Sequence, residues 1–218
     1  VRLVKEKFRF TSGTAERGSV AESRVDKAVV TEKGRGKQTH LCLGFSTLPY
    51  SRPEKMTILA LSSFLGGGMS SVLFQKIRED RGLAYAVYSF NDFYRDAGVF
   101  GVYLGTDGQN LAKATDLVLT ELRKLKRHKL TPTQLKTLKS QMKGHLILSQ
   151  ESPNGRMNRL ARQELMVGRF QTIEDMIREI ERVSASGLTD MANMILAEST
   201  IAVAVLGPAG KEMLSPVV

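Results

Sequence analysis

A run of three glycines and two serines opens the stretch 65–90, LGGGMSSVLFQKIREDRGLAYAVYSF, and constrains the fold more than any other feature. Glycine adopts backbone conformations that other residues avoid and lets neighbouring chain approach closely, so the run predicts a tightly packed turn. The apolar spacing after it predicts a short helix that begins near Met69 or Ser70 and stops at Gly82. The glycines of the turn are Gly66, Gly67 and Gly68.

Two strong hydrogen-bond donors follow the turn. Arg78 lies in the last turn of the predicted helix, at the rim of its apolar face. Tyr85 comes seven residues later, at the start of a predicted strand over residues 83–90. Aimed at one point, a guanidinium and a phenol could hold a peptide carbonyl or a developing oxyanion. The residues alone favour a simpler interpretation, a solvated helix-end cation and a half-buried strand tyrosine.

Composition and charge exclude several classes of protein. The 218 residues suffice for one sizeable core, and no linker divides them. The net charge is +10, but the cations are scattered along helices without a nucleic-acid motif, so nucleic acid is not an expected partner. Cys42 is the only cysteine, which excludes a disulfide framework; its apolar neighbours predict a small core residue. The uncharged stretch 56–75 contains the glycine turn, so no membrane span is expected.

The remaining patterns predict a few strands and a helical second half. Capping signals open helices at Ser51, Asp107, Thr131 and Ser152, with capping boxes in Ser51-Arg52-Pro53-Glu54 and Thr131-Pro132-Thr133-Gln134. Two more helices are expected over 173–183 and 187–197, a partial helix over 1–8 and a loop over 11–23. Strands are expected over 28–32, 39–45, 98–106 and 201–206, the last central and covered on both faces. The pattern predicts an α+β fold: a two-layer sandwich with a mainly antiparallel sheet and helices packed on one face.

The motif L-G-G-G-M-S-S-x-L-F-Q-x-[IV]-R-E-x-R-G-L-A-Y resembles the C-terminal, non-zinc half of the pitrilysin and mitochondrial-processing-peptidase family of inverted-motif zinc peptidases. The likeness continues to about Gly207, and the family half has the same α+β arrangement. The resemblance implies that Arg78 and Tyr85 are the catalytic pair that reaches the substrate at the metal. The candidate residues for substrate binding or domain contact are Gly66, Gly67, Gly68, Arg156 and Arg159; a structural salt-bridge role for the two arginines stays open.

The zinc ligands of that family are missing from this chain. Its three histidines, His40, His128 and His145, do not lie in H-x-x-E-H or H-E-x-x-H spacing, so no metal site is predicted here. In the family the motif belongs to a homologous zinc-binding half, upstream in the same polypeptide or on a partner subunit. Zinc is therefore expected on that partner half, with the motif glutamate as general base. The chain alone is predicted to be inactive.

The sequence thus predicts the C-terminal half of a zinc metalloendopeptidase that closes the cleft over a peptide or unfolded protein. The alternative is a catalytically inert scaffold or partner subunit of the same family; the intact arginine–tyrosine pair favours the enzyme. Residues 1–218 are expected to form one domain, a fragment that lacks its first strand and the zinc-binding half, because the chain starts inside an apolar pattern. A soluble protein of the bacterial cytoplasm or periplasm is expected, and a homodimer is left open.

Overall fold

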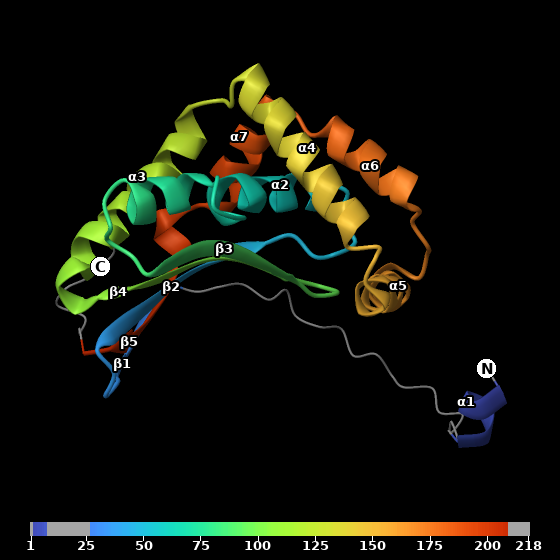
Figure 1. Cartoon of the computed structure of the whole chain (residues 1–218), viewed down its shortest axis with the longest axis horizontal. Coiled ribbons are helices and arrows are strands. Elements are labelled where there is room, and N and C mark those ends of the chain that lie inside the picture. Colours follow the sequence, from blue (N-terminus) through green and yellow to red (C-terminus); the bar gives the residue numbers. More distant parts are fainter. Residues whose placement is uncertain (1, 8–26, 209–218) are drawn as a thin grey trace.

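The computed structural model describes residues 2–7 and 27–208 and shows one sheet beneath a layer of helices (Figure 1). The strands are β1 (Ala28–Lys33), β2 (Gln38–Thr47), β3 (Ala86–Phe93), β4 (Gly98–Asp107) and β5 (Ala202–Gly207). The α-helices are α1 (Arg2–Lys7), α2 (Lys55–Gly66), α3 (Leu111–Arg127), α4 (Pro132–Leu148), α5 (Pro153–Val167), α6 (Ile173–Arg182) and α7 (Ala185–Ile195). Short helices of other types are η1 (Phe74–Glu79), η2 (Gly108–Asn110) and η3 (Glu198–Thr200).

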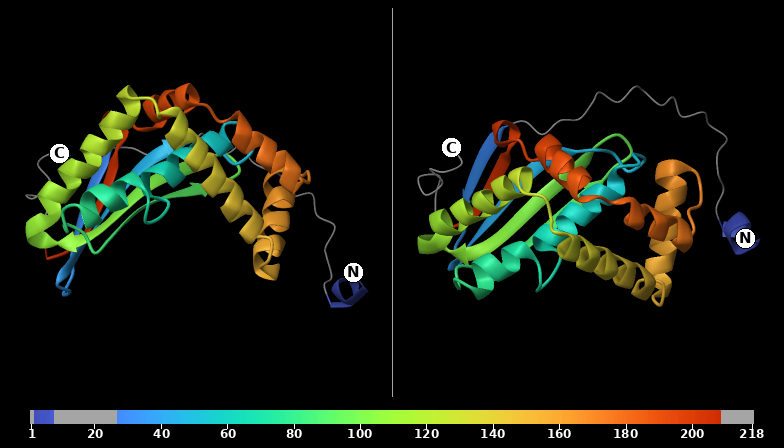
Figure 2. Two further views of the ribbon diagram at one scale, coloured as in Figure 1. Left: turned by 45° about the horizontal axis from the view of Figure 1, so that its top comes forward. Right: turned by 90° about the horizontal axis from the view of Figure 1, so that it is seen from above.

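The sheet has the order β1-β5-β2-β4-β3. Three of its pairs, β2–β4, β3–β4 and β2–β5, are antiparallel, and β1–β5 is parallel. Helices α2, α3, α4, α6 and α7 lie on the same side of this sheet (Figures 1 and 2). The predicted α+β fold, with a mainly antiparallel sheet and helices on one face, is therefore confirmed. The parallel pair was not anticipated.

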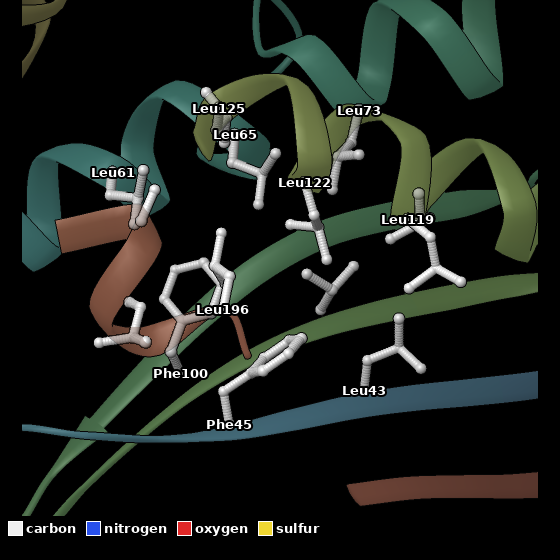
Figure 3. Close-up of a cluster of buried hydrophobic side chains, with 14 of the residues drawn as sticks. Leu43, Phe45, Leu61, Leu65, Leu73, Phe100, Leu119, Leu122, Leu125 and Leu196 are labelled. Atoms are coloured by element: carbon white, nitrogen blue, oxygen red, sulfur yellow. The ribbon is translucent and has the colours of Figure 1, made fainter. Parts of the chain in front are cut away.

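The core lies between the sheet and the helices (Figure 3). Alternate residues of β2, namely Leu41, Leu43 and Phe45, are buried on the helix-facing side, as their spacing predicts. The rings of Phe45 and Phe100 lie 6.3 Å apart, centroid to centroid, and join β2 to β4. Leucines from α2 and α3 close the cluster from above.

The other face of the sheet has no α-helix packed on it among the described elements (Figure 1). This corrects two predictions. In β5, Val203 and Val205 are buried, but Leu206 is exposed, so the strand is covered on one face only. Cys42 also points to the uncovered face, since it alternates with the buried residues of β2; it is half-buried, and burial raises the pKa of its thiol.

The helix starts predicted at Thr131 and Ser152 are confirmed, and the one predicted at Ser51 is wrong. The capping box at Thr131 is present, with Gln134 N donating to Thr131 Oγ1, and Ser152 accepts from Gly155 N. The box at Ser51 was wrong: α2 begins at Lys55 after Glu54, whose side chain makes no capping hydrogen bond. The predicted loop over 11–23 and part of the predicted helix over 1–8 lie outside the described residues. No helix of the described residues has the length and apolar character needed to cross a membrane.

Candidate functional site

The glycine run packs the end of α2 directly against β3. A Cβ atom added at Gly66 would lie 2.2 Å from the backbone nitrogen of Ser89, which no side chain can tolerate. The Ser89 hydroxyl donates to the carbonyl oxygen of Ser62 at 2.7 Å across the same contact. The tight turn that the sequence predicts is therefore present, and it holds the end of α2 against β3.

The chain turns through residues 67–71 and begins a new helix at Val72, two or three residues later than the predicted start near Met69 or Ser70. This helix widens into the π-helical turn η1. Leu73 and Ile77 are fully buried and anchor it to the core. Arg78 is exposed in its last turn, with the guanidinium 4.9 Å from the centre of the Phe74 ring. Gly82, at φ +60°, then reverses the chain toward β3, as predicted.

Tyr85 lies immediately before β3, and the sheet holds its backbone. Its N–H donates to the carbonyl oxygen of Gly105 at 2.8 Å, which extends the β3–β4 ladder by one bond. Just upstream, the buried Thr106 hydroxyl donates to the carbonyl oxygen of Leu83 at 2.5 Å. The Tyr85 side chain is 51% exposed. A rigid backbone therefore presents a phenol to solvent.

The phenol of Tyr85 donates a hydrogen bond to Asp107 Oδ1 at 2.8 Å. Because this bond stabilises the neutral phenol, it raises the pKa of Tyr85; burial contributes less. The sequence predicts Asp107 as the cap of a long helix, and this was wrong. Asp107 precedes η2 without a capping hydrogen bond from its side chain, and α3 begins only at Leu111. The antiparallel pairing of β3 with β4 was predicted, and it places the start of β3 beside the end of β4; that signal could have revealed the contact.

Arg78 lies in η1 and Tyr85 just before β3, and the two side chains have separate partners. Arg78 is stacked on Phe74 and Tyr85 is bonded to Asp107, and no hydrogen bond joins the two donors in the described part of the chain. Their convergence on one substrate atom stays a prediction. A cavity of about 340 Å³ lies beside the glycine turn between η1 and α4. Ser70, Gln75 and Gln141 are among its lining residues, whereas Arg78 and Tyr85 are not.

The two other candidate arginines lie on α5, beyond the end of the sheet (Figure 1). Arg159 Nη1 donates to the carbonyl oxygen of Gln171 at 3.1 Å, and the guanidinium carbon lies 5.8 Å from the centre of the Phe170 ring. These contacts tie Arg159 to the α5–α6 connection, and its part in substrate binding or domain contact stays a prediction. Arg156 is exposed, and its part in substrate binding or domain contact stays a prediction.

The histidines do not fit a zinc site. His40 on β2 pairs through Nδ1 with the Tyr103 hydroxyl at 2.6 Å, whereas His128 follows α3 and His145 lies on α4. Within residues 2–7 and 27–208, no group of three or more His, Cys, Asp or Glu side chains is placed to hold a metal ion.

Comparison with known proteins identifies the family. Residues 8–142 match the family model described as the peptidase M16 inactive domain, so the chain belongs to that family. It is 38% identical over 181 residues to the uncharacterized zinc protease YmxG of Bacillus subtilis, covering 83% of this chain and 44% of the relative. An uncharacterized zinc protease of Mycobacterium tuberculosis is 36% identical over 180 residues, covering 83% and 41%. The chain thus spans less than half the length of these relatives.

Solved structures share the fold. A protease from Helicobacter pylori matches with a TM-score of 0.79 at 23% identity, over 93% of this chain and 50% of that one. A peptidase M16 inactive domain from Pseudomonas fluorescens matches with a TM-score of 0.76 at 20% identity, over 86% and 45%. These two structures show the shared fold, and the family model with the sequence relatives confirms the family resemblance found in the sequence.

Proposed function

We propose that this chain is the non-zinc half of a zinc metalloendopeptidase, and that Arg78 and Tyr85 are its contribution to the active site. One observation carries the proposal: a chain of the M16 inactive-domain family presents two strong donors, both exposed, on elements anchored in its core. Rigid elements with exposed polar tips are what a site needs to meet a substrate held partly by another domain.

Tyr85 donates its phenol O–H to the oxyanion that forms when the scissile carbonyl is attacked. Arg78 holds a neighbouring carbonyl of the substrate backbone or supports the same oxyanion. Its stacking on Phe74 does not prevent this, because an exposed cation–π contact is worth only about 0.5 to 1 kcal/mol. Zinc on the partner half supplies the activated water when bound. Peptides and unfolded proteins are the substrate class, since both donors act on backbone carbonyls.

The inert-scaffold alternative makes a different prediction about the same residues. A scaffold needs no exposed donors at η1 and before β3, so their replacement would leave its function unchanged. The enzyme proposal requires both donors to affect peptide hydrolysis without affecting zinc binding, because the zinc ligands are on the other half.

Reconstitution tests the proposal. This chain and its zinc-binding half are combined, and cleavage of a fluorogenic peptide is followed with and without a chelator. We expect chelator-sensitive cleavage only when both halves are present. Arg78→Gln should lower kcat/KM about tenfold or more at unchanged zinc content. The matched control is Arg81→Gln, three residues further on, whose exposed guanidinium donates to the carbonyl oxygen of Lys76.

Two results would contradict the proposal. Robust, zinc-dependent cleavage by this chain alone would show that it does not depend on a partner half. Equal kcat/KM for Arg78→Gln and Arg81→Gln would remove Arg78 from the site.

A further inference from the structure

The contact between Tyr85 and Asp107 has a chemical consequence for the proposed site. A phenol has one O–H, and in this structure it is donated to the Asp107 carboxylate at 2.8 Å. The same proton would be donated to the substrate oxyanion. An ionised carboxylate has no proton to offer in return, so it can only accept. The two bonds are therefore mutually exclusive, and the substrate oxyanion must replace Asp107 as the acceptor of the phenol O–H.

Asp107 is the group that orients the Tyr85 phenol in this structure. The Tyr85 side chain is half-exposed, and Asp107 is its only hydrogen-bonding partner among the described residues. The carboxylate sits at the end of β4, while Tyr85 N is bonded to Gly105 two residues earlier in that strand. Adjacent strands therefore fix both groups. Asp107 also has no capping bond to the helix that follows, which would otherwise explain its position.

We propose that Asp107 is a positioning residue for Tyr85, whose carboxylate holds the phenol in the resting half and competes with the substrate oxyanion for its proton. This inference rests on the proposed function. A hydrogen bond to a charged acceptor is stronger than one to a neutral acceptor. Donation of the phenol O–H to the substrate oxyanion therefore requires the hydrogen bond to Asp107 to be broken, and the strength of that bond sets the free-energy cost. Asp107→Asn keeps the shape of the side chain but removes its charge, which lowers that cost.

The first test measures the effect of the hydrogen bond on the pKa of Tyr85 and requires no enzymatic activity. The complete protein is labelled with 13C at tyrosine Cζ, and the Tyr85 signal is assigned by its loss in Tyr85→Phe. We expect Asp107→Asn to lower the pKa of Tyr85, because the charged acceptor no longer stabilises the neutral phenol. The internal control is Tyr103, whose pKa is raised mainly by burial and should not change. An unchanged Tyr85 pKa would overturn the inference.

The second test is a double-mutant cycle in the zinc-loaded enzyme. Asp107→Asn should raise kcat/KM about threefold or more when Tyr85 is present, and should have no effect in the Tyr85→Phe background. Melting temperatures establish that both variants are folded. A fall in kcat/KM, or the same change in both backgrounds, would overturn the competition between Asp107 and substrate.

The two failures can be told apart. If Tyr85→Phe turns over at a near-normal rate, the proposed function fails, and the competition fails with it. If Tyr85→Phe is slow but Asp107→Asn leaves kcat/KM unchanged, only the role of Asp107 is overturned.

Discussion

Two parts of the molecule hold their helices by different means. The covered layer consists of the sheet with α2, α3 and α7, and the arm consists of α4, α5 and α6 (Figure 2). Helix α3 buries a full stripe that includes Leu111, Val118 and Leu122, whereas α5 buries only Gln163. The arm and its connections also expose large apolar side chains: Ile147, Leu148, Met157, Leu160, Leu165, Val167 and Phe170. Burial is therefore more extensive on α3 in the covered layer than on α5 in the arm.

Capping signals are intact at α4 and α6 in the arm, whereas the cap predicted at Asp107 in the covered layer is diverted. Capping boxes open α4 at Thr131 and α6 at Thr172, and Lys143 bonds Glu181 at 2.6 Å between these helices. At the start of α3, the capping candidate Asp107 is instead bonded to Tyr85. A tertiary contact can therefore prevent a side chain from capping the helix that follows it. In this protein the diverted side chain belongs to the candidate site.

The largest difference between the two parts should appear when large apolar side chains are removed. Phe45→Ala in the covered layer should lower the free energy of unfolding by about 3 to 5 kcal/mol, because it leaves a cavity against Phe100. Leu165→Ala in the arm should change it by less than about 0.5 kcal/mol, because Leu165 is 74% exposed. Urea denaturation measures both, and equal losses would remove the distinction between the two parts.

A second pair compares glycines. Gly66→Ala should destabilise by about 2 to 3 kcal/mol, because the new Cβ meets the Ser89 backbone. Gly144→Ala in α4 should stabilise by about 0.5 to 1 kcal/mol, because its Cβ meets no atom within 4 Å beyond the adjacent backbone of its own helix, and alanine favours the helix. Thermal unfolding measures the sign of each change. A stabilising Gly66→Ala would show that α2 and β3 are not in close contact.

The smallest expected effect concerns the ion pair within the arm. Lys143, followed by Lys139, lowers the pKa of Glu181 below its usual value. A carboxyl with a lowered folded-state pKa adds stability above its unfolded pKa, and loses that contribution as the pH falls through its folded pKa. Lys143→Met should therefore lower the melting temperature slightly at neutral pH, and the difference should vanish once the pH is below the folded pKa of Glu181. An equal difference in both conditions would assign the effect to packing.

The sequence was informative where pattern and local chemistry act alone. Alternation in β2 predicted the buried set Leu41, Leu43 and Phe45, and the Thr131 box predicted the start of α4. Prediction from the sequence failed where the structure depends on residues that are distant in the chain. The uncovered face of β5 depends on which elements pack there, and an apolar run does not encode this. The bond between Tyr85 and Asp107 depends on the register of β3 against β4, which composition does not determine.

In the candidate site, too, some residues were predicted from the sequence and others were found only in the structure. Arg78 and Tyr85 were found because their spacing matches a family, and the structure shows both to be exposed on anchored elements. The residues that contact them in this structure, Phe74 and Asp107, were not predicted from the sequence.

The turnover of Tyr85→Phe in the zinc-loaded two-half enzyme tests the central proposal most directly. Loss of the phenol O–H should lower kcat about a hundredfold or more, because an oxyanion donor is removed. Zinc content should not change. Tyr94→Phe, which removes the hydroxyl of another exposed tyrosine in the β3–β4 turn, should retain normal turnover. Near-normal kcat in Tyr85→Phe would contradict the assignment of this residue to the active site.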